Sequence, residues 1–267
     1  MADTDASTLL DLAVTAARAG AELAARRRAE GLGEVGTKST DTDLVTAADR
    51  AVERLLIEIL LGARPDDRVL GEEGGATGTG GSVRWIIDPI DGTVNYVYGL
   101  PQYAVSVAAE VDGQVVAGVV RNATTGEEWT AIRGGGAWRD GHRLAGSAAT
   151  TLDRCLIATG FGYDAARRAH QAAVLAHLLP LVRDVRRFGA AAIDLCLAAE
   201  GKLDAYYEKG LNAWDHAAGG LVATEAGLLV TGLRGAPPGP TMVIAAMPAV
   251  YDELHTMLVE LDADGGP

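Results

Sequence analysis

Acidic residues placed where short apolar runs end are the clearest chemical signal in this sequence. Glu72 follows the run at 68–70, and Asp88 and Asp91 follow the run at 85–87. If these carboxylates converge, two of them roughly 4 Å apart repel by about 4 kcal/mol at an effective dielectric of roughly 20, so the group must bind protons or cations. Oxygen donors without neighbouring Cys or His favour Mg²⁺ over zinc or copper. The alternative is that the aspartates simply cap a turn.

The segment WIIDPIDGTVNYVYG at 85–99 adds a candidate anion site. Pro89 biases Asp88 toward an extended backbone, so we expect the acids to stand on a rigid turn at the edge of a sheet. Gly92 and Thr93 then allow a short helical segment, whose free N–H groups can hold an anion. A metal ion and a phosphate group can therefore meet at this turn.

Two further acids stand at predicted helix starts, where an acid can serve either as a helix cap or as a residue of the site. Thr46 and Asp49 have the spacing of a capping box, and from these residues alone we interpret Asp49 as a cap. Asp215 follows Trp214, and a first-turn acid and a site acid are equally good interpretations of it. Lys38 is a lone cation that we interpret as a solvated side chain.

Several other catalytic patterns are rejected. The D-x-D-x-V spacing at 41–45 is typical of aspartyl-phosphate phosphatases, but a polar segment precedes it where that chemistry requires a buried strand. The chain has no P-loop and no G-x-S-x-G elbow. Cys155 and Cys196 have neither partners at metal-ligand spacing nor the arginine of a cysteine-phosphatase loop, and they indicate no disulfide framework.

Composition and net charge limit the kinds of partner that the chain can bind. The 267 residues include 48% hydrophobic and 22% charged residues, which is typical of a globular protein, and the formal net charge is −13. A chain with this much negative charge is unsuited to binding nucleic-acid phosphates directly. It would need metal cations at a phosphate-binding site. No apolar run approaches membrane-spanning length, and the N-terminus carries acids where a signal peptide carries Lys or Arg. We expect a cytoplasmic protein without membrane contact.

The elements that must position these acids follow from periodicity. Apolar spacing predicts helices at 8–30 and 46–61, and alternation predicts an antiparallel sheet over 103–145 with turns at Asp112-Gly113 and Asp140-Gly141. The glycine-rich segment GGATGTGGS is interpreted as a flexible surface connection.

From residue 154 onward, strands and helices alternate. The predicted strands are 154–160, 184–188, 203–208 and 241–246, and the predicted helices are 165–183, 190–200, 214–227 and 248–261. We therefore predict an α+β half over 1–145 that carries the metal-binding loop, followed by an α/β half over 146–267 that completes the active site.

Three segments in order, GEEG at 71–74, WIIDPIDGTVNYVYG at 85–99 and WDHAAGGLVATEAG at 214–227, resemble the inositol monophosphatase family, most closely its bacterial inositol-1-monophosphatase branch. The resemblance extends over most of the chain, from 41–49 through 186–208. It implies a layered αβαβα sandwich, a homodimer, and Mg²⁺-dependent, Li⁺-inhibited hydrolysis of phosphate monoesters with two to three ions per active site.

The resemblance also assigns roles to residues. One Mg²⁺ would take Glu72, Asp88 and the carbonyl of Ile90, a second would take Asp88, Asp91 and Asp215, and a third would sit on Glu72 near Asp49. The catalytic set implied is Asp49, Thr93 and Glu72, with Asp49 and Thr93 activating a water molecule. The substrate contacts implied are Asp91, Gly92, Thr93, Gly189, Ala190, Ala191, Glu208 and Asp215. Ala190 departs from the family pattern because it lacks the hydroxyl commonly found there.

The function that we predict is that of an inositol-1-monophosphatase, with water as the direct nucleophile because no Ser, Cys or Asp nucleophile is suitably placed. The metal motifs leave three other ester substrates of the superfamily open: fructose 1,6-bisphosphate, 3′-phosphoadenosine 5′-phosphate and histidinol phosphate. An alternative of another class is a regulatory scaffold that binds a transcription or RNA-processing partner.

Overall fold

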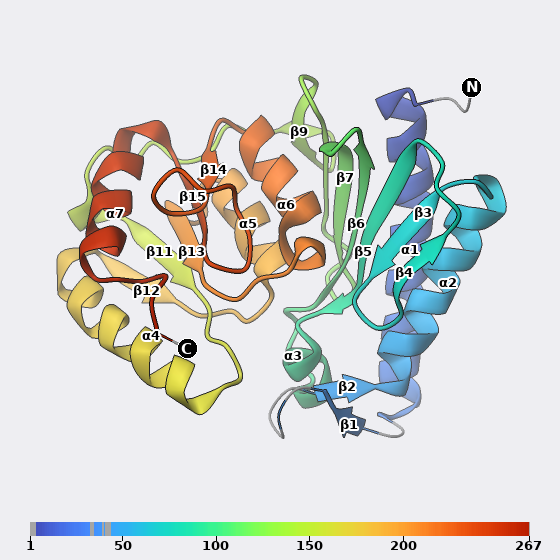
Figure 1. Cartoon of the computed structure of the whole chain (residues 1–267), viewed down its shortest axis with the longest axis horizontal. Helices are drawn as coiled ribbons and strands as arrows, with labels where there is room; N and C mark the ends of the chain where they lie inside the picture. The colour runs from blue at the N-terminus through green and yellow to red at the C-terminus, as the bar shows by residue number, and fades with distance from the viewer. Residues whose placement is uncertain (1–3, 33–34, 39, 41–43, 267) are drawn as a thin grey trace.

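Five layers, helix, sheet, helix, sheet and helix, stack along the long axis of the computed structural model, which describes residues 4–32, 35–38, 40 and 44–266 (Figure 1). This arrangement confirms the layered αβαβα sandwich. The helices of the three helical layers are, in order across the molecule, α1 (Ala6–Glu30) with α2 (Ala47–Ala63), α5 (Ala191–Ala199) with α6 (Ala213–Glu225), and α4 (Ala165–Leu178) with α7 (Pro248–Glu260).

The first sheet has eight strands in the order β10-β9-β8-β7-β6-β5-β3-β4, and all neighbours are antiparallel except β3 and β5. Its strands are β3 (Arg68–Gly71), β4 (Gly75–Gly78), β5 (Val83–Asp91), β6 (Ala104–Val111), β7 (Gln114–Asn122), β8 (Glu128–Ile132), β9 (Gly136–Arg139) and β10 (His142–Arg143). The two predicted hairpin turns are confirmed, since Asp112, Gly113, Asp140 and Gly141 all have the positive φ of a type I′ turn.

Two expectations about this sheet were wrong. The acids of the DPID segment do not stand at a sheet edge, because β5 lies between β6 and β3 and continues to Asp91. Pro89 falls where the register with β6 shifts, between Asp88 and Asp91, and a bulge tolerates a residue that cannot donate to the ladder. The segment GGATGTGGS is not all connection, since β4 pairs with β3 as an exposed edge strand that needs no apolar side chains.

The second sheet has five strands in the order β12-β11-β13-β15-β14, with β12, β11 and β13 parallel and β15 antiparallel to its neighbours. The strands are β11 (Leu156–Thr159), β12 (Asp184–Arg186), β13 (Ala205–Glu208), β14 (Leu229–Thr231) and β15 (Val243–Ala246). The alternation of strands and helices is confirmed, but β14 was not predicted, because three residues are too few to show a period. Helix α4 ends earlier than predicted, and Pro180 follows in a short 3₁₀ turn.

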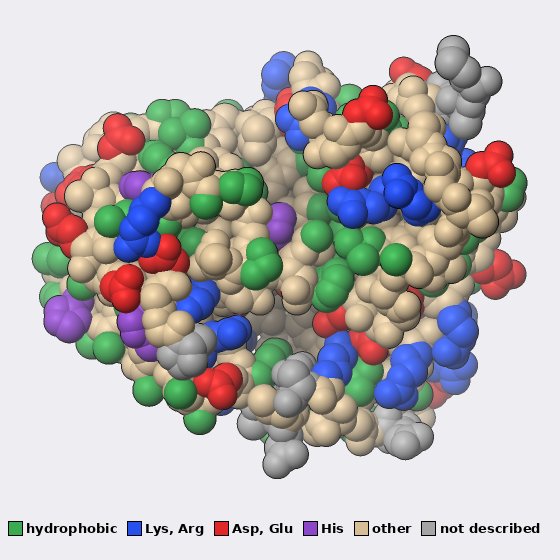
Figure 2. All heavy atoms as spheres, viewed as in Figure 1, with side chains coloured by type: hydrophobic (Ala, Val, Ile, Leu, Met, Phe, Trp, Pro, Cys, Tyr) green, Lys and Arg blue, Asp and Glu red, His purple; other side chains and the backbone are tan. Residues whose placement is uncertain are grey.

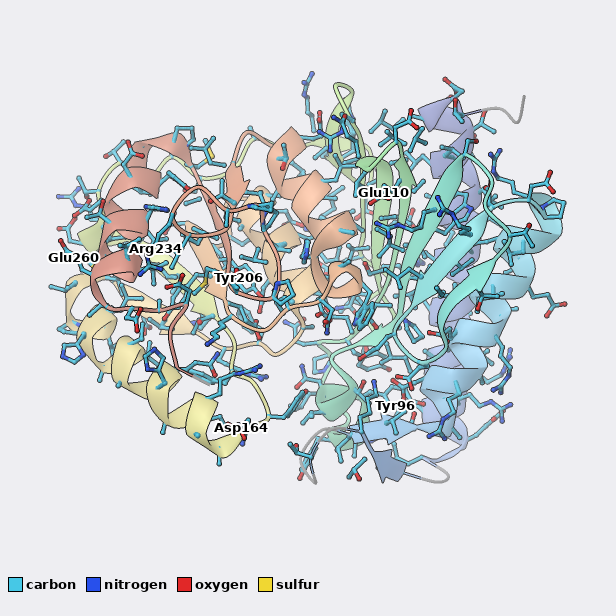
Figure 3. All side chains as sticks on the ribbon, in the orientation of Figure 1. Tyr96, Glu110, Asp164, Tyr206, Arg234 and Glu260 are labelled. Atoms are coloured by element: carbon cyan, nitrogen blue, oxygen red, sulfur yellow. The ribbon has the colours of Figure 1, made fainter. Side chains whose placement is uncertain are left out.

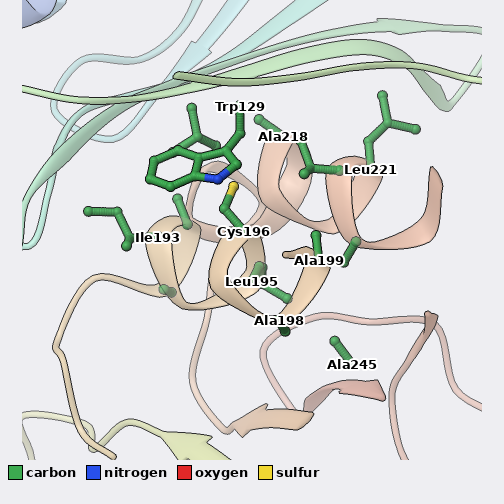
Figure 4. Close-up of a cluster of buried hydrophobic side chains, with 14 of the residues drawn as sticks. Trp129, Ile193, Leu195, Cys196, Ala198, Ala199, Ala218, Leu221 and Ala245 are labelled. Carbon is green, nitrogen blue, oxygen red and sulfur yellow. The ribbon is translucent and has the colours of Figure 1, made fainter. Parts of the chain in front are cut away.

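The middle helices pack closely against the first sheet because small residues face each other. A Cβ on Gly118 of β7 would lie 3.1 Å from the Cα of Ala218 on α6, so backbone nearly touches backbone there. Figure 4 shows Trp129 of β8 against Cys196 and Ile193 of α5 in the same core. A second cluster joins α1 and α2 to the outer face of the sheet, and a third joins α4 and α7 to the second sheet.

The connection between α1 and α2 carries a two-stranded pair, β1 (Val35–Thr37) and β2 (Leu44–Thr46), beside α3 (Thr93–Tyr98) (Figure 1). Most of the D-x-D-x-V pattern at 41–45 falls outside the described residues. No helix in the described ranges combines the length and the apolar character needed to cross a bilayer.

Candidate active site

The end of β5 and the start of α3 form the corner around which the site is built. Gly92 connects them in the left-handed region at φ 90°, which a glycine adopts without strain. A Cβ there would lie 2.8 Å from the carbonyl oxygen of Gln102 and 3.2 Å from the Cβ of Ala190. Because Ala190 precedes α5, this corner is also where the first sheet meets the middle helical layer.

Three carboxylates converge beside this corner. Asp88 and Asp91 come from β5 and Asp215 from the first turn of α6, and one oxygen of each lies within 4.8 Å of the others. Backbone N–H groups orient all three: Ile90 donates to Asp88 at 3.0 Å, Ala192 to Asp91 at 2.7 Å and Asn212 to Asp215 at 2.6 Å. Asp215 follows Asp91 by more than a hundred residues in the sequence, and the fold brings it beside the two acids of β5.

The electrostatics of the cluster call for a cation. Burial, followed by the neighbouring carboxylates, raises the pKa of Asp88 and of Asp215 well above the ordinary value, and burial raises the pKa of Asp91 to about 7. No Lys or Arg makes an ion pair with these three acids in the described part of the chain. Hard, backbone-oriented oxygen donors with uncompensated charge fit a divalent cation of the Mg²⁺ type.

Glu72 faces the same cleft from the end of β3, but it is not one of the three converging acids. The ammonium of Lys38 lies 2.8 Å from Glu72 and 2.5 Å from Glu73. The interpretation of Lys38 as a solvated side chain was therefore wrong, since only 23% of that side chain is exposed. Burial lowers the pKa of Lys38, but the two glutamates outweigh burial and raise it above the ordinary value. Nothing in the flanking residues signalled this ion pair.

Asp49 serves both as a helix cap and as a partner of the site. One carboxylate oxygen accepts the N–H of Thr46 at 2.8 Å and its hydroxyl at 2.5 Å, which completes the predicted capping box. The other oxygen accepts the hydroxyl of Thr93 at 3.0 Å, and the carbonyl of Ile90 lies 3.1 Å from that hydroxyl. Burial raises the pKa of Asp49. A buried acid thus contacts the hydroxyl that faces the cleft.

The cleft joining these groups has a volume of about 640 Å³. Of the residues predicted for the site, it is lined by Glu72, Asp88, Ile90, Asp91, Gly92, Thr93, Gly189, Ala191, Glu208 and Asp215, and it is also lined by Lys38, Arg167, Arg187 and Lys209. Figure 2 shows a hollow between the two halves of the molecule with basic and acidic side chains at its rim. Lys38, Arg167 and Lys209 were not predicted as cleft residues.

Two residues of the predicted set stand behind the cleft wall. Asp49 is fully buried and reaches the cleft only through Thr93. Ala190 is 1% exposed and packs against Gly92, so its side chain offers no surface to a substrate.

Glu208, at the end of β13, is held on the opposite side of the cleft. The hydroxyl of Tyr206 donates to its Oε2 at 2.6 Å, and Gly160 leaves room for the carboxylate. Figure 3 shows Tyr206 in the five-stranded layer, across the molecule from Tyr96 of α3. Residues from both sheets therefore face one cleft.

The chain is similar to known proteins over nearly its whole length. The sequence profile of the inositol monophosphatase family matches residues 5–261. The inositol-1-monophosphatase of Mycobacterium leprae is 49% identical over 241 residues, covering 86% of this chain and 83% of that protein. The protein named Nus factor SuhB of Pasteurella multocida is 38% identical over 252 residues, covering 92% and 94%.

A solved structure, Mycobacterium tuberculosis SuhB, superposes with a TM-score of 0.84 at 42% identity and covers 98% of this chain and all of that one. The similarity in fold thus extends over both sheets and all helical layers.

Proposed function

The chain belongs to the inositol monophosphatase family, and on this premise we propose that it is a Mg²⁺-dependent phosphate monoester hydrolase that releases inositol and phosphate from inositol 1-phosphate. The observation that carries the proposal is the convergence of Asp88, Asp91 and Asp215 next to the hydrogen-bonded pair Asp49 and Thr93. The name of the M. leprae relative supports the choice of substrate.

The metal ligands we propose are those the family resemblance implies. Glu72, Asp88 and the carbonyl of Ile90 would hold one Mg²⁺, Asp88, Asp91 and Asp215 a second, and Glu72 a third. When bound, Mg²⁺ lowers the pKa of water and neutralises phosphoryl and leaving-group oxygens. The protein contributes orientation, because backbone N–H groups hold the three converging carboxylates in place.

Thr93 and Asp49 form the proposed route for the proton of the attacking water. The Thr93 hydroxyl donates to Asp49, so its lone pairs are free to accept a hydrogen bond from water in the cleft. As the water attacks phosphorus, its proton passes to the Thr93 oxygen and the Thr93 proton to the Asp49 carboxylate. The bond from phosphorus to the inositol oxygen breaks, and that oxygen takes a proton from solvent water to leave as the inositol hydroxyl. Burial suits Asp49 to this role, since a raised pKa makes the carboxylate a better base.

The substrate lies between the corner at Gly92 and the carboxylate of Glu208. Backbone N–H groups of Gly92 and Thr93 hold phosphate oxygens, while Asp91 and Glu208 accept hydrogen bonds from inositol hydroxyls. Gly189 and Ala191 contribute backbone beside the ring, because both line the cleft. Since Ala190 is buried, we exclude its side chain from these contacts.

The proposal is tested by measuring phosphate release from four esters: inositol 1-phosphate, fructose 1,6-bisphosphate, 3′-phosphoadenosine 5′-phosphate and histidinol phosphate. We expect the first to give the highest kcat/KM, with activity lost in EDTA, restored by Mg²⁺ and inhibited by Li⁺. A higher value for another ester would reassign the substrate, and full activity in EDTA would overturn the metal requirement. Phosphate transfer to an added alcohol would contradict direct attack by water.

The relative named Nus factor SuhB favours a second candidate role, that of a scaffold for a transcription partner. Asp91→Asn separates the two roles, because it alters the metal cluster without changing the outer surface. A cellular phenotype that survives the loss of hydrolysis would favour the scaffold.

We also propose, from the family resemblance, that the chain is a homodimer, which light scattering would test.

A further inference from the structure

Glu53 on α2 is a buried acid to which the proposed reaction gives no role. Its side chain is 4% exposed, and it follows Asp49 by four residues, so the two acids lie on the same face of the helix. One carboxylate oxygen, Oε2, accepts the N–H of Glu73 at 2.8 Å, and the other, Oε1, accepts the N–H of Gly74 at 2.7 Å. Glu53 therefore holds the backbone of the turn that follows β3 at two consecutive residues.

The sequence of this turn leaves space for that carboxylate. A Cβ on Gly71 would lie 2.4 Å from Oε2 of Glu53, and a Cβ on Gly74 would lie 2.9 Å from Oε1. Glycine thus stands on both sides of the pair Glu72 and Glu73, where any other residue would push the carboxylate away. The N–H groups of Glu73 and Gly74, with the space left by Gly71, thus form a cradle for the Glu53 carboxylate.

The residue directly before the two held N–H groups is Glu72. It lies between Gly71 and Glu73, and its side chain faces the cleft. A turn fixed at two consecutive N–H groups leaves Glu72 little freedom to move away from the site. Displacements of about 1 Å at such positions are enough to lower catalytic rates about a hundredfold.

We propose that Glu53 is a positioning residue that aims Glu72 at the divalent cation. This inference rests on the proposed function, because it requires Glu72 to be a metal ligand. It implies that a single helix, α2, sets two parts of the site: Asp49 directly, through its own side chain, and Glu72 indirectly, through the turn that Glu53 holds.

The test measures Mn²⁺ binding to the full chain without substrate, by the electron paramagnetic resonance signal of free Mn²⁺. Glu53→Gln keeps the size of the side chain but places an NH₂ group against one of the two N–H donors. Gly71→Ala leaves Glu53 intact and forces its carboxylate away from the turn. We expect each variant to bind Mn²⁺ about 10- to 100-fold more weakly in at least one site, as for other residues that orient metal ligands.

Glu58→Gln is the matched control, since Glu58 is an exposed acid on the same helix and should leave Mn²⁺ binding unchanged. Asp215→Asn tests the proposed metal site itself. If Glu53→Gln and Gly71→Ala are folded and bind Mn²⁺ like the parent while Asp215→Asn does not, the positioning role is wrong and the proposed function stands. If the parent binds no Mn²⁺, both fall. Should Glu53→Gln not fold, Gly71→Ala decides.

Discussion

Asp49 shows how one side chain meets two demands. Its two carboxylate oxygens have different partners. One completes the capping box with Thr46, and the other accepts a hydrogen bond from the hydroxyl of Thr93. The capping role could be predicted from the spacing of Thr46 and Asp49, because a capping box is a local pattern. No local pattern predicts the contact with Thr93, since it joins residues 44 positions apart, and only the family resemblance paired the two residues. Lys38 and Glu53 were missed for the same reason: their partners lie on the turn after β3.

Asp49→Asn tests the proposed proton acceptor. Asparagine is close to aspartate in size and keeps an oxygen for the N–H of Thr46, so we expect the thermal midpoint to stay within a few degrees. The amide cannot take up a proton, and kcat should fall by about 10²- to 10⁴-fold. Steady-state kinetics and circular dichroism on the same samples check both expectations. A kcat within about twofold of the parent would remove Asp49 from the reaction.

Some of the elements that carry the site are easier to predict from the sequence than others. Helices α1 and α2 begin and end within two residues of their predicted bounds, because long amphipathic runs show a clear period. The three-residue strand β14 and the edge strand β4 show none. The bulged end of β5 was expected as a turn, since Pro89 signals a break without showing whether the strand resumes.

Gly92→Ala tests the corner between β5 and α3. The new Cβ would lie 2.8 Å from the Gln102 carbonyl oxygen, in addition to the strain of a positive φ. We expect a loss of about 1–3 kcal/mol in the free energy of unfolding and lower activity, because the corner carries Thr93. The matched control is Gly113→Ala, which has a similar φ of 77° and no atom within 4 Å of the new Cβ. Equal losses in the two variants, measured by urea denaturation, would show that the corner is not sterically constrained.

At the scale of the whole molecule, the fold concentrates buried acidic charge where the first sheet meets the middle helical layer. The chain carries a net charge of −13, and the converging acids come from β5 on one side and α6 on the other. The family resemblance predicted these acids and the layered fold, whereas composition predicted only that a phosphate site would need cations. The division into halves at residue 145 stays a prediction, although the cleft draws residues from both.

The raised pKa values predict how the stability of the metal-free protein depends on pH. The folded state binds protons on Asp91 up to a pKa of about 7, whereas the unfolded state releases them near 3.8. The folded form therefore binds more protons between these values, so the free energy of unfolding falls as the pH rises from 5 to 7.5. Thermal unfolding in EDTA should show a lower midpoint at pH 7.5 than at pH 5.

Mg²⁺ should reverse this loss, because a cation that binds only the folded state adds RT ln(1 + [L]/Kd), about 2.7 kcal/mol at a hundredfold excess over Kd. In Asp215→Asn, both the pH dependence and the Mg²⁺ effect should be smaller, while Glu58→Gln should behave like the parent. A midpoint that rises with pH in EDTA would contradict the assignment of the cluster as uncompensated carboxylates.

The most direct measurement is the anomalous scattering of a crystal grown with Mn²⁺ at saturating concentration. The proposed chemistry predicts a strong anomalous peak among the carboxylates of Asp88, Asp91 and Asp215, with a second peak bounded by Glu72 and Asp88. The absence of any peak between the three aspartates, in a crystal where their side chains are well ordered, would contradict the metal-dependent hydrolysis proposed for this protein.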